Sequence, residues 1–205
     1  MTRITFVRHG EVHNPRRVIY GRLPRFRLSP HGIKQATHVA EALAAESVDA
    51  VVSSPLLRAR QTAARILGRQ PALRLQISRD LIEVLTPYQG LPATEIAFRR
   101  EDFYTDSPPP FEQPADVLAR MSRFAARHAR RHPGGHVVAV THGDPIAFFA
   151  LWAGGAAVTP ANKTRLAPLG IGGGYPGHAS ATTYTVPADP QGVPVLLAYR
   201  AAPYT

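Results

Sequence analysis

The stretch ITFVRHGEVHNP (residues 4–15) begins like a buried strand and then turns polar without a transition. Its first four residues are apolar or β-branched, which favours a strand. Arg8, His9 and Gly10 follow at once. A polar turn would explain them, but in open α/β sheets ligands bind beyond the carboxyl ends of the strands. A cation and a histidine at such an end therefore suggest a site for an anion.

Strands and helices are expected to alternate along the rest of the chain. The hydrophobic pattern predicts strands at residues 3–8, 48–54, 72–78 and 136–142, and helices at 31–47, 56–68, 115–132 and 146–154, with a short helix near 93–100. Two more strands, 181–186 and 195–200, are expected to pair antiparallel. The fold class that follows is α/β. We expect a three-layer α/β/α sandwich with a mostly parallel sheet, helices on both faces and an antiparallel edge strand, in a single domain over residues 1–205.

Ser29-Pro30 and Ser54-Pro55 stand in front of two of the predicted helices. A serine before a proline is typical of an N-cap followed by the first helical position. We therefore expect both serines to cap helices.

Composition narrows the classes of protein. Of the 205 residues 44% are hydrophobic and none is cysteine, so the chain can form a substantial core but no disulfide, thiol nucleophile or thiolate metal site. No apolar run approaches the roughly 20 residues that span a bilayer, and the N-terminus has no signal-peptide pattern. These features predict a cytoplasmic protein with no membrane partner.

The formal net charge is +10 and comes almost entirely from arginine. Such a charge attracts anions, whether nucleic acids or phosphorylated metabolites. The sequence lacks a basic run with interleaved aromatic residues, which single-strand binders use. We therefore expect a small phosphorylated substrate and no nucleic-acid partner.

Two further strand ends carry residues that match the first. The second strand ends in SSP and is followed by Arg58, and the fourth ends in THG, which contains His142. With Arg8 and His9, these side chains can face one pocket. The arginine fork matches phosphate oxygens, and a neutral histidine can attack phosphorus to give a phosphohistidine. The residues thus predict an attacking group and an electrostatic clamp for a phosphoryl group.

The order of these motifs resembles the histidine phosphatase superfamily, in its phosphoglycerate mutase-like branch. The matching segments are RHGE (8–11), LSPHGIKQA (28–36), SSPLLRARQTA (53–63) and THGDPI (141–146). The resemblance implies a phosphatase or mutase that needs no metal or other cofactor.

The resemblance also implies roles for individual residues. His9 would be the phosphorylated nucleophile, and Arg8, Arg58 and His142 would bind the phosphoryl group. Glu83 would donate a proton to the leaving oxygen. An ordinary glutamate, with a pKa of about 4.3, is ionised at neutral pH, so burial and the phosphate charge would have to raise its proton affinity.

The substrate is expected to contact a wider set of residues. Asn14 resembles an asparagine that follows the first motif in the family, although here it lies one residue closer than usual. Gly10 and Gly143 would let the backbone approach the phosphate. The residues expected to bind substrate are Asn14, Gly10, Gly21, Arg22, Arg99, Arg100 and Gly143.

Three histidines recur at intervals of four: His128, His132 and His136. Two histidines one helical turn apart can bind zinc. The residues Pro133-Gly134-Gly135 are expected to break the helix, and no nearby cysteine or carboxylate completes a ligand set. No metal site is expected.

Three functions remain open on the sequence alone. The mutases that this chain resembles usually have more residues between the acid and the fourth strand. The shorter segment after Glu83 therefore favours a phosphomonoester hydrolase that acts on a small metabolite. The alternatives are a 2,3-bisphosphoglycerate-dependent phosphoglycerate mutase, in which Arg99 and Arg100 would hold a carboxylate, and a non-catalytic phosphate-binding protein. The oligomeric state is open, with a homodimer as one option.

Overall fold

The sheet runs through the middle of the molecule. The computed structural model describes residues 1–97, 102–189 and 192–201, and within them six strands pair in the order β3-β2-β4-β1-β5-β6. The strands are β1 (Thr2–Arg8), β2 (Ala50–Ser53), β3 (Leu75–Ile77), β4 (His136–Thr141), β5 (Ala181–Val186) and β6 (Val195–Arg200). The first four run parallel, β5 pairs antiparallel with β1, and β6 with β5.

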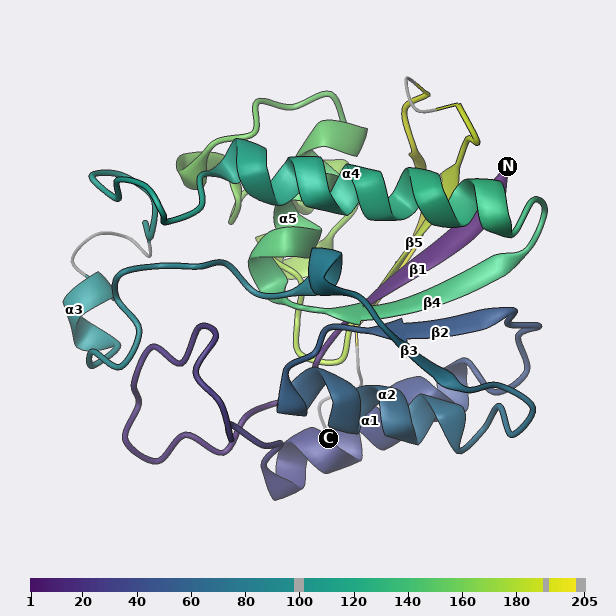
Figure 1. Cartoon of the computed structure of the whole chain (residues 1–205), viewed down its shortest axis with the longest axis horizontal. Helices are drawn as coiled ribbons and strands as arrows, with labels where there is room; N and C mark the ends of the chain where they lie inside the picture. Colours follow the sequence, from purple (N-terminus) through teal and green to yellow (C-terminus); the bar gives the residue numbers. More distant parts are fainter. Residues whose placement is uncertain (98–101, 190–191, 202–205) are drawn as a thin grey trace.

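Helices cover both faces of the sheet (Figure 1). On one face lie α1 (Pro30–Ala42) and α2 (Leu57–Leu67), and on the other α4 (Pro114–Arg131) and α5 (Gly143–Ala153). The short α3 (Thr94–Ala97) lies away from the sheet. Short 3₁₀ helices lie in the connections: η1 (Arg79–Leu81), η2 (Pro160–Asn162), η3 (Ala167–Leu169) and η4 (Gly172–Gly174). The predicted α/β class and its layers are confirmed, with two antiparallel strands at one edge of the sheet where one was expected.

The strand β1 packs against both helical layers because its side chains alternate between the two faces. Ile4 and Phe6 are fully buried toward α4 and α5, where the Phe6 ring lies 4.9 Å from that of Phe149. Val7 points the other way, into the cluster beneath α1 and α2. The β-branched and aromatic residues that predicted this strand are the ones that hold it in the core.

The prediction that both serines cap helices is half right. Ser29 caps α1, because its side chain accepts a hydrogen bond from the Gly32 N–H at 2.9 Å. Ser54 does not cap α2, because the N-cap position lies two residues later, at Leu56. The Ser54 hydroxyl lies 2.8 Å from Nε2 of His142 and accepts the Leu56 N–H only at 3.4 Å. The tertiary contact is therefore the shorter of the two.

The register of the parallel strands brings their carboxyl ends together. Arg8 of β1 lies opposite Thr141 of β4, and Val140 of β4 lies opposite Ser53 of β2. The residue after each of these three strands therefore emerges at the same edge of the sheet.

Within the described part of the chain, no helix combines the length and the apolar character needed to cross a bilayer.

Candidate active site

His9 lies immediately beyond β1 and is 1% exposed. Its main-chain N–H donates to the Thr141 carbonyl at 3.1 Å, which ties it to the end of β4. Its ring atom Nδ1 lies 2.7 Å from the Gly10 carbonyl oxygen. Because a carbonyl only accepts, Nδ1 carries the proton and Nε2 keeps its lone pair. Nε2 accepts a hydrogen bond from Nε of Arg58 at 3.1 Å.

Two arginines flank this ring. Arg58, in the first turn of α2, is fully buried; its guanidinium donates to the Gly21 carbonyl at 2.8 Å and lies 4.7 Å from the centre of the Tyr20 ring. Arg8 donates to the Pro176 carbonyl at 2.7 Å. One buried N–H group of each arginine has no hydrogen-bond partner. Buried donors are normally satisfied, so these groups mark a place where an anion can bind.

His142 follows β4 and faces His9, with 5.1 Å between the ring centres. Its Nε2 lies 2.8 Å from the Ser54 hydroxyl, and its Nδ1 has no hydrogen-bond partner. That Nδ1 is 3.6 Å from a carboxylate oxygen of Glu83. The second histidine therefore lies between the end of β2 and the acidic residue.

Glu83 enters the site from the connection that follows β3 and η1. Oε2 of Glu83 is 3.9 Å from the Arg58 guanidinium, while Oε1 accepts the Val84 N–H at 2.9 Å. The segment is fixed by Thr141, whose hydroxyl donates to the Leu81 carbonyl at 2.7 Å. The predicted group of Arg8, His9, Arg58, Glu83 and His142 thus comes together from four separate parts of the chain.

Burial and neighbouring charges tune the three titratable groups. Burial lowers the pKa of His9 and of His142 well below the ordinary value of 6.5, and the charge of Arg58 adds to both shifts. Burial raises the pKa of Glu83, as does the charge of Asp144, and both outweigh the opposing effect of Arg58. The histidines are therefore held neutral, and the carboxyl is held closer to its protonated form.

A cavity of about 280 Å³ lies next to this group. Arg8, Gly21, Glu83, Asp144 and Tyr175 line it on the polar side. The other lining residues are Ile19, Tyr20, Val84, Thr86, Ala93, Ile96, Ala97 and Phe103. The cavity offers space for a molecule whose anionic end meets Arg8.

Two of the residues expected to bind substrate are engaged elsewhere. Asn14 holds its own loop, because its amide donates to the Val18 carbonyl at 2.8 Å and accepts the Val18 N–H at 3.2 Å. Arg22 donates to the main-chain carbonyl of Glu83 at 2.6 Å and to the carboxylate of Glu112 at 2.7 Å. Neither residue lines the cavity. Arg99 and Arg100 lie outside the described residues.

Gly10 and Gly143 are constrained by the protein itself. A Cβ on Gly10 would lie 2.4 Å from the Gly32 carbonyl oxygen, and a Cβ on Gly143 would lie 2.1 Å from the Tyr175 hydroxyl. Close packing on α1 and on Tyr175 is therefore sufficient to require both glycines. The expected approach of a phosphate to their backbone stays a prediction.

Several residues of the site carried no clear signature in the sequence. Tyr20 lies under Arg58, and the ring centre of His178 is 5.8 Å from that of His9. Asp144 accepts hydrogen bonds from the Tyr104 and Tyr175 hydroxyls at 2.5 and 2.6 Å, and from Lys163 at 2.9 Å. Asp144 directly follows the THG motif, and this position is the one feature of the sequence that indicates a role for it in the site.

A bound cation is disfavoured at the centre of the site. Donor atoms of His9, Glu83 and His142 lie within 4.8 Å of one another. The guanidinium of Arg58 already occupies Nε2 of His9 and lies beside Glu83, so a divalent ion would meet a fixed positive charge. The cluster suits an oxyanion better than a metal.

The three histidines that recur at intervals of four do not gather. His128 and His132 stack with ring centres 5.8 Å apart, whereas the ring of His136 makes hydrogen bonds with Thr5 and Arg3.

Known proteins are similar to this chain to different degrees. The uncharacterized protein Rv0525 of Mycobacterium tuberculosis is 40% identical over 152 residues, which cover 71% of this chain and 75% of that protein. The structure of the mycobacterial glucosyl-3-phosphoglycerate phosphatase Rv2419c complexed with VO3 is 30% identical, with a TM-score of 0.72 over 89% of this chain and 92% of that one.

A more distant structure has the same fold. The putative alpha-ribazole-5'-P phosphatase of Escherichia coli is 20% identical, with a TM-score of 0.77 over 98% of this chain and 97% of that one. The family model described as "Histidine phosphatase superfamily (branch 1)" matches residues 4–172, which include all three strand ends of the site. The chain therefore belongs to the histidine phosphatase superfamily, branch 1.

Proposed function

We propose that the protein hydrolyses phosphomonoesters through a phosphohistidine formed on Nε2 of His9. The observation that carries this proposal is the hydrogen bond from Nδ1–H of His9 to the Gly10 carbonyl, which leaves the lone pair of Nε2 on the side of Arg58. A low pKa of His9 keeps this lone pair available at neutral pH.

In the first half-reaction, Nε2 of His9 attacks the phosphorus in line and the bond to the ester oxygen breaks. Arg8 and Arg58 would balance the charge on the phosphoryl oxygens, and the neutral ring of His142 would donate a hydrogen bond to one of them. When an oxygen of the substrate accepts the Nε–H of Arg58, His9 is released from that hydrogen bond. Glu83 protonates the departing oxygen, which matches its raised pKa and its position 3.6 Å from His142.

In the second half-reaction, water takes the place of the departed alcohol. The Glu83 carboxylate accepts a proton from this water, which attacks the phosphohistidine. Phosphate leaves, His9 is restored as a neutral ring, and Glu83 is protonated for the next cycle. No group outside the five side chains of the cluster is needed to balance the protons.

Hydrolysis is favoured over the mutase alternative by the relative named as a phosphatase at 30% identity. The paired arginines that a mutase would use, Arg99 and Arg100, lie outside the described residues. A mutase would convert one phosphoglycerate into another when 2,3-bisphosphoglycerate is added. A phosphatase would release inorganic phosphate with or without it.

The decisive experiment traps the covalent intermediate. The wild-type protein, mixed briefly with a ³²P-labelled phosphomonoester and quenched in alkali, should carry label that acid removes. His9→Ala should carry none and should turn over at least about 10³-fold more slowly. His132→Ala is the matched control and should label normally. His132 ends α4 and precedes β4, so it lies near the end of β4 that is remote from the site. Label in His9→Ala would refute the assignment, and a wild-type protein that releases no phosphate would favour the non-catalytic alternative.

A further inference from the structure

The cavity beside the reactive cluster is mostly apolar where it extends away from Arg8. Its far wall comes from α3 and the residue before it, and α3 lies away from the sheet in Figure 1. Ala93, Ile96 and Ala97 form this wall, and the rings of Tyr20 and Phe103 form its sides. The part of a substrate that leaves with the ester oxygen would therefore meet aliphatic and aromatic surface.

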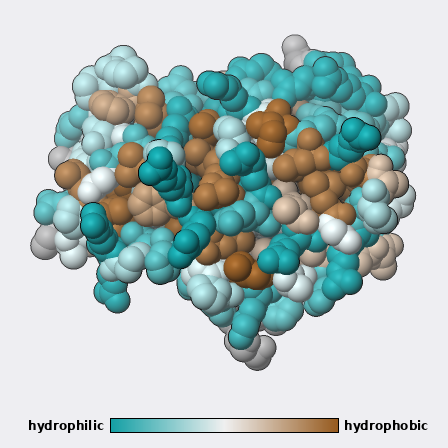
Figure 2. All heavy atoms as spheres, turned by 60° about the horizontal axis from the view of Figure 1, so that its bottom comes forward, coloured by the Kyte–Doolittle hydropathy of each residue, from teal (hydrophilic) through white to brown (hydrophobic). Residues whose placement is uncertain are grey.

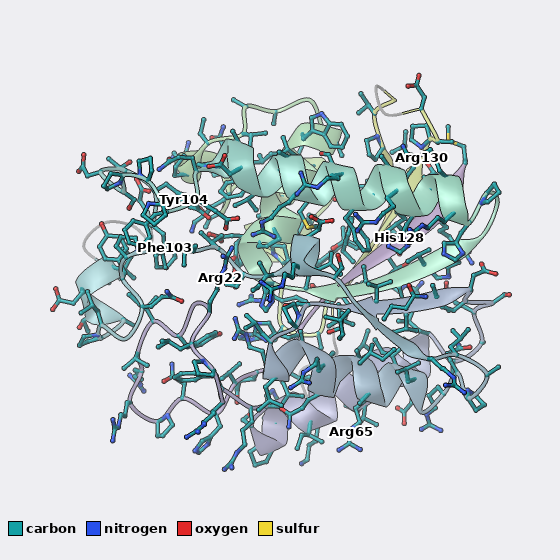
Figure 3. The ribbon with its side chains drawn as sticks, viewed as in Figure 1. Arg22, Arg65, Phe103, Tyr104, His128 and Arg130 are labelled. Carbon is teal, nitrogen blue, oxygen red and sulfur yellow. The ribbon has the colours of Figure 1, made fainter. Side chains whose placement is uncertain are left out.

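Among the described residues that line this cavity, positive charge is scarce despite the net charge of the chain, and Arg8 is the one cation. Arg22 and Lys163 lie near but are committed: Arg22 to Glu83 and Glu112, and Lys163 to Asp144. In Figure 3, Arg22 lies between the sheet and the region of Phe103 and Tyr104. These two cations are not free to hold a second anionic group.

The two acidic residues of the cavity add to this effect. Glu83 and Asp144 both line it. The carboxylate of Asp144 accepts hydrogen bonds from Lys163 and from two tyrosine hydroxyls. Burial would raise the pKa of Asp144, but these partners outweigh it and lower the pKa below the ordinary value. A carboxylate or second phosphate on the leaving group would lie near the ionised Asp144 and on apolar walls, with no free cation among the described lining residues to pair with it, which is unfavourable.

We infer that the site selects phosphomonoesters whose leaving group is uncharged and carries an apolar part about the size of an aromatic ring. The inference rests on the proposed function and makes it specific. The volume of about 280 Å³ accommodates a ring and a short linker next to the phosphoryl position, and Tyr20 and Phe103 offer ring faces and edges for contact.

Three esters of primary alcohols test the inference, because their leaving oxygens are of similar basicity. They are ethyl phosphate, 2-phenylethyl phosphate and 3-phosphooxypropionate, which differ by a hydrogen, a phenyl ring and a carboxylate at the same carbon. Burial of the phenyl ring should raise kcat/KM at least about 10-fold over that of ethyl phosphate, mainly through KM. The carboxylate should lower it below that of ethyl phosphate.

Two pairs of variants locate the effect. Ala97→Arg adds a cation at an exposed position of the cavity wall. It should raise the ratio of kcat/KM for 3-phosphooxypropionate to kcat/KM for ethyl phosphate about 10-fold. The control Ala97→Gln, which has a long but neutral side chain, should leave this ratio unchanged. Phe103→Ser should lower the preference for the phenyl ester more than Phe103→Leu, which keeps apolar surface. Thermal melting of each variant confirms folding, and the Ala97 pair stands if a Phe103 variant does not fold.

The outcomes separate this inference from the proposed function. Release of phosphate from none of the three esters would refute the proposed function. Hydrolysis with equal kcat/KM for the ethyl and phenyl esters would leave the function standing and overturn the inference. A preference for 3-phosphooxypropionate that disappears in Arg99→Gln and Arg100→Gln would also overturn it, in favour of a second anion site.

Discussion

The orientation of His9 depends on a carbonyl that contacts the far side of its ring. Nδ1–H of His9 donates to Gly10, and Gly10 is itself held by its packing on Gly32 and by a hydrogen bond from its N–H to the Thr62 hydroxyl at 3.1 Å. The proton on Nδ1 is therefore fixed by main-chain geometry and not by a carboxylate. The glycine after the histidine thus positions the ring in addition to closing a turn.

Glu83→Gln provides a prediction at the same scale. If Glu83 donates a proton, the variant should slow the hydrolysis of ethyl phosphate by about 10²–10³-fold and that of p-nitrophenyl phosphate by much less, since p-nitrophenolate leaves without a proton. Because Glu83 acts in its protonated form, kcat/KM of the wild type for ethyl phosphate should fall as the pH rises through its raised pKa. Measured pH profiles should lack this alkaline fall in Glu83→Gln. Equal slowing of both esters would rule out the role of proton donor.

At the scale of elements, the active site joins strand ends to irregular segments. The ends of β1, β2 and β4 supply His9, Ser54 and His142 on backbone that is paired on both sides. Asp144, at the start of α5, gathers the loop of Tyr104, the 3₁₀ region of Lys163 and the loop of Tyr175. One buried carboxylate therefore ties three long connections together, in addition to their own backbone hydrogen bonds.

Removal of Lys163 should therefore be costly. Lys163 is 2% exposed and its ammonium lies 2.9 Å from Asp144 and 4.6 Å from the Phe103 ring centre. Lys163→Met leaves the carboxylate without a counter-charge and should lower the free energy of unfolding by roughly 3–5 kcal/mol, measured by urea denaturation. The control is Arg69→Met, which breaks an exposed pair with Glu41 and should cost less than about 1 kcal/mol. Similar costs for the two variants would contradict a structural role for the buried pair.

The sequence predicted those parts of the site that follow from regular structure. The strands end where the apolar runs end, and parallel pairing then forces Arg8, His9 and His142 to one edge. Ser54 was predicted as a cap because its local sequence favours one, but a hydroxyl bond to His142 prevails. Lys163 and Tyr175 could not be placed, since they lie in segments without periodicity and act through partners that are distant in the chain. Arg22 is among the residues expected from the sequence to bind substrate, whereas in the structure its partners are Glu83 and Glu112.

At the scale of the whole molecule, exposed arginines are found on both helical layers. Arg65 of α2 and Arg130 of α4 are both exposed and lie on opposite sides of the sheet (Figure 3). Figure 2 shows the molecule turned so that the bottom of Figure 1 comes forward, and on this face apolar side chains are interspersed with hydrophilic ones. The net charge of +10 attracts anions to the molecule in general, whereas the proposed selection between leaving groups would depend on the cavity alone.

Acid should destabilise the fold. Burial is the main reason why the pKa values of His9, His142 and His136 lie below the ordinary value. Burial also lowers the pKa of His128 to about 4 and the pKa of His178 to about 3. Each of these rings takes up its proton more readily in the unfolded chain, so stability is complete above about pH 6.5 and is lost as the pH falls toward the folded pKa values. A well-buried ring of this kind can cost up to about 2 kcal/mol at pH 5.

The expected result is a Tm at pH 5.0 that is several degrees below that at pH 7.5 at constant ionic strength. His128→Leu should reduce this difference, because the ring lies in the buried face of α4, 4.4 Å from that of Phe124. His132→Leu, at the end of the same helix, serves as the control. A Tm that does not change between the two pH values would show that the buried histidines are not linked to folding.

The placement of β1 has a consequence for how enzymes of this architecture diversify. β1 lies between β4 and β5 and is hydrogen-bonded on both sides, so the backbone that carries Arg8 and His9 tolerates little change. The cavity walls at Ile19, Ala97 and Phe103 belong to loops and a one-turn helix outside the sheet. Mutations can accumulate in those walls without disturbing the strands. Under the proposed function, changes in these walls would alter the preference for a leaving group and would leave the residues at the strand ends as they are.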